Sequence, residues 1–263
     1  MFKTKIGLLA SALAVGVMGF AGIAGATHSW GGYHWARTAN PFTIKLGDNL
    51  SAAWDSYLVT TSNDWSVSSV LDTVIVPGVV SPKTCKPTLG QAEICNSKYG
   101  RNGWLGIASI WATGGHITQG AVKMNDTYFN TAKYNTPAWR NVVMCQEVGH
   151  IFGLDHQDEN FSNGDLGTCM DYSNDPNPNQ HPNAHDYEML DEIYAHLDTT
   201  NTASQTLSAA DQSIDFNDPK EWGSELKKSK DGAASLFGRE LSNGSKVFTF
   251  VYWADSKRAH DEH

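Results

Sequence analysis

Alternation of apolar and polar residues predicts the strands of this chain. Residues 42–46 alternate as a half-buried strand does, and residues 73–76 form a β-branched run. Two further strands are expected at residues 104–111 and 120–125, on either side of the turn signal Gly114-Gly115. We expect these segments to pair in one twisted, mixed sheet.

Three helices follow from capping residues and from the spacing of apolar positions. Asp48 is the expected cap of the first helix. The second begins after Thr136, whose hydroxyl precedes a proline at the first helical position, and covers residues 137–152. Gly153 can end it in a left-handed conformation. A last helix is expected to begin near Asn183.

Two other segments differ in composition from the predicted core. Residues 77–103 are rich in Pro, Lys, Asn and Gly, and we expect an irregular excursion there. Near the end of the chain, residues 235–241 and 246–253 flank the turn Asn243-Gly244, which predicts a β-hairpin. A hairpin alone is barely stable, so we expect this one to dock on the main domain.

The first 26 residues have the layout of a secretory signal peptide. Lys3 and Lys5 are followed by an apolar stretch over residues 6–21 and by the small residues Ala24-Gly25-Ala26. We therefore expect a secreted, extracellular protein. The complete division is a signal peptide at 1–26, a main domain at 27–198, a linker at 199–213 and a small hairpin appendage at 214–263.

Charge and hydropathy narrow the range of partners. The net charge is −9, and removal of the signal peptide takes away two lysines and no acid, which leaves −11. An acidic chain is a poor binder of nucleic acid. No second long apolar run exists, so we expect neither a nucleic-acid partner nor a membrane partner, and we expect a monomer.

The four cysteines suit a disulfide framework in an exported chain. They are Cys85, Cys95, Cys145 and Cys169. Four cysteines allow three pairings. Short local spacing favours Cys85 with Cys95 and Cys145 with Cys169, and the second bond would join the helix at 137–152 to the loop that follows it.

The candidate metal-binding and catalytic residues are concentrated between Gln146 and His156. Gln146 and His150 are four residues apart, so a helix places both on one face. Gly153 permits a sharp turn that brings His156 back toward that face. Two imidazoles and one further donor then converge, which suits Zn²⁺ with an open coordination position. Glu147 lies where a general base can reach a water on the metal.

This stretch resembles the extended signature of the metzincin zinc metallopeptidases, H-E-x-x-H-x-x-G-x-x-H followed by a methionine turn. Met170 occupies the position of the turn methionine, and Tyr172 that of a tyrosine beside the metal in some branches of the family. The resemblance is strong over residues 104–172 and loose over 28–198. Trp104 and Trp111 then bracket the expected edge strand, to which a substrate would add as a further strand.

The resemblance implies an α+β fold in which the active-site helix lies above a cleft and a smaller irregular lower subdomain ends in a helix. It implies a secreted zinc-dependent metalloendopeptidase that hydrolyses peptide or protein substrates through a metal-activated water. His150, His156 and Gln146 would bind Zn²⁺, Glu147 would be the general base, and Tyr172 would donate a hydrogen bond to the oxyanion.

Gln146 departs from the family pattern, which has histidine at the first ligand position. A neutral amide oxygen is a weaker zinc donor than imidazole. Three alternatives follow. The side-chain oxygen of Gln146 can complete a weaker zinc site, or another residue can supply the third ligand. In the third alternative, the chain is a catalytically impaired, protease-like extracellular binding protein. Retention of the carboxylate of Glu147 favours the enzyme. The candidates for a replacement ligand are Cys145, His116, His181 and His185.

Overall fold

The computed structural model describes residues 28–158, 160, 163–203 and 215–254. The helices are α1 (Asp55–Trp65), α2 (Asp126–Phe129), α3 (Pro137–Ile151) and α4 (Ala184–Ile193), with a 3-10 turn at Pro219–Glu221. The strands are β1 (His34–Trp35), β2 (Phe42–Asn49), β3 (Leu71–Pro77), β4 (Gln91–Ser97), β5 (Trp104–Thr113), β6 (His116–Asn125), β7 (Ser224–Lys228), β8 (Ala234–Glu240) and β9 (Lys246–Trp253). The expected signal peptide and most of the expected linker lie outside the described residues.

All nine strands belong to one mixed sheet, in the order β3-β2-β4-β6-β5-β9-β8-β7, with β1 paired beside β6. The pairs of β2 with β3, β2 with β4, and β4 with β6 are parallel. From β6 onward through β5, β9, β8 and β7, every pair is antiparallel. The structure is therefore mixed α/β, with the expected twisted mixed sheet enlarged by its C-terminal strands.

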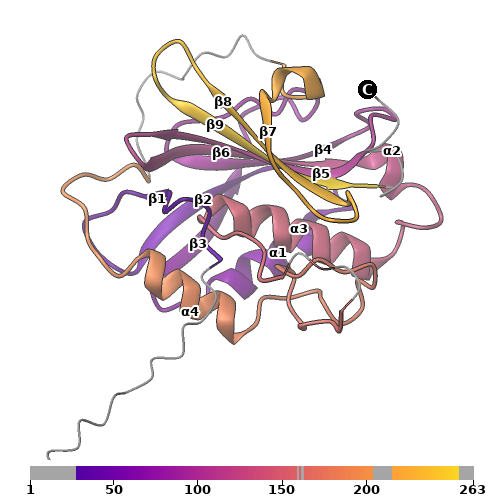
Figure 1. The fold of residues 1–263 in the computed structure, drawn as a ribbon, viewed down its shortest axis with the longest axis horizontal. Coiled ribbons are helices and arrows are strands. Elements are labelled where there is room, and N and C mark those ends of the chain that lie inside the picture. Colours follow the sequence, from indigo (N-terminus) through magenta and orange to yellow (C-terminus); the bar gives the residue numbers. More distant parts are fainter. Residues whose placement is uncertain (1–27, 159, 161–162, 204–214, 255–263) are drawn as a thin grey trace, which may run out of the picture.

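Helices α1, α3 and α4 gather on one side of the sheet (Figure 1). The larger apolar cluster fills the space between them and the sheet; it includes Trp65, Val148 and Ile151 from the helices, Trp54 just before α1, and Ile110 from β5. Because α3 is buried along nearly its whole length, apolar residues surround its polar side chains as well. This burial makes the polar groups of α3 costly unless each has a partner or a role.

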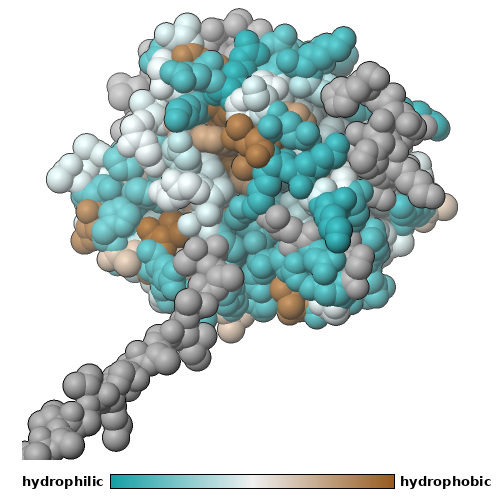
Figure 2. Space-filling model, in the orientation of Figure 1, coloured by the Kyte–Doolittle hydropathy of each residue, from teal (hydrophilic) through white to brown (hydrophobic). Residues whose placement is uncertain are grey.

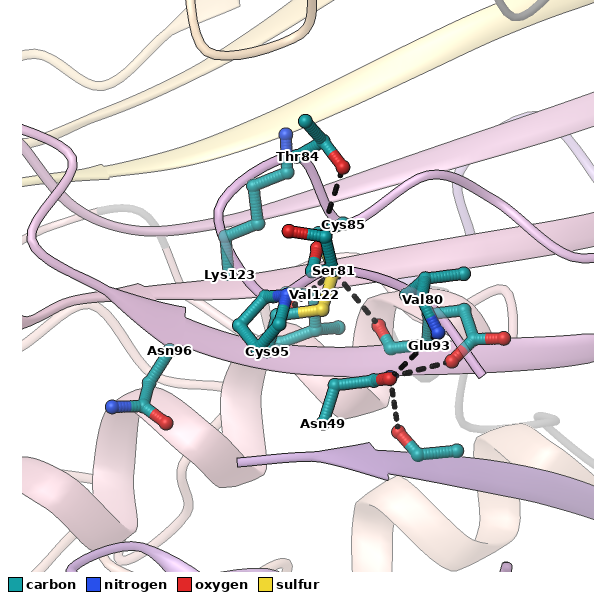
Figure 3. The surroundings of a disulfide bond; sticks show 12 residues. Asn49, Val80, Ser81, Thr84, Cys85, Glu93, Cys95, Asn96, Val122 and Lys123 are labelled. Carbon is teal, nitrogen blue, oxygen red and sulfur yellow. Dashed lines mark hydrogen bonds between the residues drawn. A yellow bond between two sulfur atoms is a disulfide. The ribbon is translucent and has the colours of Figure 1, made fainter. Parts of the chain in front are cut away.

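A second apolar cluster covers the opposite face of the sheet. It contains Ile107 and Trp111 of β5 together with Phe216 and Trp222, which flank the 3-10 turn, and the rings of Trp111 and Phe216 are in contact. The bond Cys85–Cys95 attaches the segment before β4 to that strand, and Figure 3 shows it beside Lys123 of β6. The other disulfide is Cys145–Cys169. Both pairings favoured by local spacing are confirmed, and two disulfides are consistent with an extracellular protein.

Local signals in the sequence predicted several elements closely. Thr136 caps α3 by accepting a hydrogen bond from the backbone N–H of Trp139, at 3.3 Å. Gly153, after α3, has φ +97°, as expected of a residue that ends a helix in the left-handed region. The last helix begins after Asn183, which forms a capping box with Asp186.

The prediction of an irregular segment over residues 77–103 was wrong in part, because it contains β4. The strand pairs with β2 and β6, although it carries several polar residues. Glu93 is fully buried in it, and its carboxylate accepts a hydrogen bond from Asn49 at 2.6 Å (Figure 3). It accepts another from Gln91, also at 2.6 Å. These tertiary partners allow a polar sequence to form an inner strand.

The predicted start of the first helix was also wrong. Asp48 continues β2, where it pairs with Pro77 of β3 and Ile94 of β4. Its carboxylate accepts a hydrogen bond from the backbone N–H of Leu50 at 3.0 Å and so stabilises a turn. The helix itself begins at Asp55.

The C-terminal hairpin is present, with β8 and β9 close to the expected bounds and Gly244 at φ +78° in the turn. It extends the main sheet, because β9 pairs along β5 from Trp104 to Ala112. A further strand, β7, pairs with β8. The strands β7 to β9, coloured yellow in Figure 1, therefore continue the sheet of the N-terminal part.

The described surface is mainly hydrophilic on the face shown in Figure 2, with separate hydrophobic patches. Single exposed apolar side chains are normal on a protein surface. The large ones are Val59, Val67, Val74, Val79, Leu166, Leu197 and Leu226. Within the described ranges, no helix has the length and apolar character that a transmembrane span requires.

Candidate functional site

Helix α3 carries the first half of the candidate site. Gln146, Glu147 and His150 are each 1% exposed. The helix passes close to β5 at Gly106, where an added Cβ would lie 2.5 Å from Val143 and 3.0 Å from a carboxylate oxygen of Glu147. Glycine at this position of β5 therefore leaves room for the glutamate side chain.

The turn after α3 brings the second imidazole back to the helix. A Cβ on Gly153 would lie 2.4 Å from the backbone oxygen of Tyr33, so the close approach of the chain also requires glycine. The rings of His150 and His156 lie 4.5 Å apart, centroid to centroid, at an interplanar angle of 73°. The structure thus brings together the two predicted histidine ligands.

His150 is held in one orientation by the turn itself. Its Nδ1 lies 2.8 Å from the backbone oxygen of Leu154. A carbonyl oxygen only accepts, so Nδ1 carries the proton and Nε2 keeps its lone pair for a metal. Burial lowers the pKa of His150 well below its ordinary value, and the nearby His156 lowers it further. The neutral imidazole is the form that binds metal ions.

His156 is positioned by an aspartate and an aromatic ring. Its Nδ1 lies 3.3 Å from Oδ1 of Asp155, and the ring of Tyr172 lies 3.9 Å from its own. Burial alone would raise the pKa of Asp155, but contacts with His156 and Lys227 outweigh it and hold that pKa well below its ordinary value. Asp155 is therefore a carboxylate that orients the imidazole.

Gln146 uses its amide nitrogen to contact the segment that follows α3. Nε2 donates to the backbone oxygens of Cys169, at 2.8 Å, and Asp171, at 3.4 Å. The side-chain oxygen is the remaining atom that can bind a cation. Met170 lies beneath the helix, since a Cβ on Gly149 would be 2.6 Å from its sulfur.

Glu147 is a buried carboxylate without a full set of partners. Within the described part of the chain, its Oε2 has no hydrogen-bond partner. Burial raises its pKa well above the ordinary value for glutamate. A carboxylate left unpaired in the interior is costly unless it has a partner in the working protein. His150, whose Nδ1 contacts a backbone oxygen, and His156, whose ring lies next to it, form a donor pair that fits a zinc ion.

The strand β9 covers this site in a way that the sequence did not reveal. The ring of Phe250 stacks on that of His150 at 3.9 Å, with an interplanar angle of 12°. The hydroxyl of Tyr252 donates to the backbone oxygen of Ser173 at 2.9 Å. Lys227 of β7 reaches Oδ2 of Asp155, also at 2.9 Å. The apolar arm of the predicted hairpin was visible in the sequence, but its contacts were not.

The expectation that β5 forms the edge of the sheet was wrong. The strand pairs with β6 on one side and with β9 on the other. Gly106, next to Glu147, stands opposite Tyr252, and Ala108 stands opposite Phe250. Eight residues of β9 therefore occupy the position in which a peptide would add to β5.

The alternative ligands weighed from the sequence have other partners. Cys145 is in a disulfide with Cys169. His116 lies 3.3 Å from Asp198, and His181 lies 2.7 Å from Asp64. The ring of His185 stacks on that of His28. These contacts do not favour any of the four as a replacement for the oxygen of Gln146.

A hollow opens at the beginning of α3, away from the two imidazoles. It is lined by Thr136, Pro137, Ala138 and Trp139 of the helix and by Pro176, Asn177 and Gln180 of the loop that follows Tyr172. The ring of Trp139 lies 6.2 Å from that of Tyr252. One residue of the hollow's lining therefore contacts β9.

Comparison with models of known protein families found no match, and comparison with curated proteins found none either.

Proposed function

We propose that this chain is a secreted metallopeptidase of the metzincin type, which hydrolyses peptide bonds with zinc. The observation that carries the proposal is the convergence of His150 and His156, together with the buried Glu147 on the same helix, whose Oε2 has no hydrogen-bond partner among the described residues. A metal ion and a water molecule would satisfy both the imidazoles and the carboxylate. The expected fold, with its active-site helix and lower subdomain, is part of the same proposal.

The residues have distinct roles in this reaction. His150 through Nε2, His156, and Gln146 through its amide oxygen hold the zinc ion, which supplies the Lewis acidity that hydrolysis requires. Glu147 accepts a proton from water and passes it to the departing amine. Tyr172 donates a hydrogen bond to the oxygen of the scissile carbonyl.

Gln146 makes the metal site weaker than one with three imidazoles. Its amide nitrogen is held by the backbone of residues 169 and 171, which keeps the amide in one orientation. The oxygen is thereby fixed as the third donor, and this reduces the entropy lost on binding. We expect a zinc affinity below that of the corresponding histidine site.

A second candidate is a protease-like extracellular binding protein without catalytic activity. The observation that favours it is β9, which pairs along β5 while Phe250 covers one face of His150. A peptide can add to β5 only where β9 has been displaced.

The two candidates differ in zinc content and in peptide cleavage. We expect the mature protein to cleave unstructured peptides and to lose this activity to a chelator. Glu147→Gln should lower kcat/KM by roughly 100-fold or more, since it removes the general base. Glu188→Gln, an exposed change on α4, is the matched control and should leave cleavage unchanged. Zinc-loaded protein that cleaves nothing would support the binding protein.

The ligand role of Gln146 has its own test. Gln146→His introduces the imidazole of the family pattern and should bind zinc more tightly, measured by competition with a chromogenic chelator. Gln180→His adds an imidazole in the loop that lines the hollow and should leave the affinity unchanged. If Gln146→His also leaves it unchanged, Gln146 is not a ligand.

A further inference from the structure

Four metal-binding side chains meet at a place remote in sequence from the helix α3. His34 lies in β1, His116 begins β6, and His196 and Asp198 follow α4. His34 and His116 are directly paired across the parallel strands β1 and β6. Within the described chain, the candidate ligand atoms of His34, His116 and Asp198 lie within 4.8 Å of one another.

The donor atoms of His34, His116 and Asp198 face a common point, and His196 lies beside them. Oδ1 of Asp198 lies 3.5 Å from Nε2 of His34, 3.3 Å from that of His116 and 3.7 Å from that of His196. Nε2 of His196 lies 3.1 Å from Nε2 of His34. The rings of His34 and His196 are nearly perpendicular, at 89°.

Further contacts keep these donor atoms aimed at that point. Nδ1 of His34 lies 2.9 Å from the backbone oxygen of Gly32, which only accepts, so Nε2 of the neutral ring keeps its lone pair. Oδ2 of Asp198 receives hydrogen bonds from the side chain of Arg37, at 2.9 Å, and from its backbone N–H, at 3.2 Å. This leaves Oδ1 as the oxygen that faces the imidazoles.

These distances match a tetrahedral zinc site. Zinc binds imidazole nitrogen and carboxylate oxygen at about 2.0–2.1 Å, so neighbouring ligands in a tetrahedron lie about 3.3 Å apart. The separations from Oδ1 of Asp198 to Nε2 of His34 and of His116, 3.5 and 3.3 Å, are close to that value. We propose that His34, His116 and Asp198 form a second zinc site, separate from the one proposed on α3, with His196 beside it.

The position of the site between distant segments indicates a structural role. Its three protein ligands leave the fourth tetrahedral position, beside His196, to a water molecule. The ion joins β1, the beginning of β6 and the segment after α4, which are distant in the sequence. The proposal does not rest on the proposed peptidase function, because the two sites share no residue.

The site also supports the turn that carries His156. The segment before β1 holds this turn through backbone hydrogen bonds from Trp30 to the oxygen of Gly153 and from Asp155 to the oxygen of His28. The indole of Trp30 donates to the backbone oxygen of His150 at 3.1 Å. An ion at His34 would keep this segment in place.

Metal analysis of the mature chain separates the two sites. Protein stripped with a chelator and reloaded with zinc should contain two ions per chain by elemental analysis. His150→Asn, which disables the α3 site, should retain one ion, and zinc should still raise its melting temperature. Adding His34→Asn or His116→Asn to His150→Asn should weaken that remaining site by about 100-fold or more, because a ligand is lost.

A matched control is His181→Asn, which removes another partly exposed imidazole in contact with a carboxylate. In the His150→Asn background it should leave both the remaining ion and its effect on melting unchanged. Circular dichroism of each metal-free variant establishes that it is folded. The proposal is overturned if His150→Asn binds no zinc, or if its ion survives both His34→Asn and His116→Asn.

Discussion

At the scale of single residues, Lys123 shows how a buried charge affects stability. The residue lies on β6, is 1% exposed, and donates a hydrogen bond from Nζ to Asn217 at 3.0 Å. Burial lowers the pKa of Lys123 from 10.5 to about 7, although the nearby Asp215 acts in the opposite direction. The unfolded chain therefore binds more protons than the folded chain between these two values, so stability rises with pH across that range.

Lys123→Met should raise stability more at pH 6 than at pH 9. At pH 6 the folded protein must bury a charged lysine, and the free-energy cost of that lysine falls as the pH rises toward 10.5. At pH 6 we expect an increase in melting temperature of roughly 5 °C. The measurement is thermal unfolding by circular dichroism at both pH values. Lys246→Met, at an exposed position of β9, is the control, and equal shifts at pH 6 and pH 9 would contradict the assignment.

At the scale of elements, α3 combines a strong local start with nearly complete burial. Its N-cap, Thr136, satisfies the backbone N–H of Trp139, which has no partner within the helix. Proline at the first helical position adds a preset backbone angle. The helix is thus specified locally at its start, while its position against β5 depends on Gly106.

Thr136→Ala should lower the free energy of unfolding by about 1 kcal/mol, since it removes the capping oxygen. Urea denaturation followed by tryptophan fluorescence measures the change. Thr113→Ala, at an exposed position at the end of β5, should have a smaller effect. If the two variants are equally stable, the cap has no measurable role.

At the scale of the whole molecule, two disulfides join segments that approach the sheet from different sides. Cys145–Cys169 closes a loop with a sequence separation of 24 and links α3 to the segment of Met170. Cys85–Cys95 has a separation of 10 and lies in the cluster on the opposite face. Both restrict the unfolded chain, and the first also fixes the backbone oxygen to which Gln146 donates.

Replacement of Cys145 and Cys169 together by alanine should lower the free energy of unfolding by about 3 kcal/mol. It should also weaken zinc binding at the α3 site, because the acceptor of the Gln146 amide is released. The matched change of Cys85 and Cys95 should destabilise the fold without altering that affinity. Chemical denaturation and chelator competition give the two readouts, and equal zinc affinities in the two variants would contradict the expected coupling.

Much of the local structure was determined by the sequence itself. The start of α3 at Thr136, the turn at Gly153, the capping box at Asn183 and the turn at Gly244 each depend on residues within a few positions of one another. The same is true of the spacing that makes Gln146 and His150 neighbours on one helix face. Such features require only backbone geometry and short-range hydrogen bonds, which is why sequence patterns predict them.

Other features were decided only by the tertiary structure. The polar strand β4 is stable because Asn49 and Gln91 satisfy Glu93, and β9 lies on β5 because its apolar residues find partners there. The convergence of His34 and Asp198, 164 positions apart, left no local pattern. Each depends on contacts between residues distant in sequence. These contacts contribute to stability only once the sheet has formed. For that reason the sequence indicated the motif on α3 but neither the strand that covers it nor the second group of histidines.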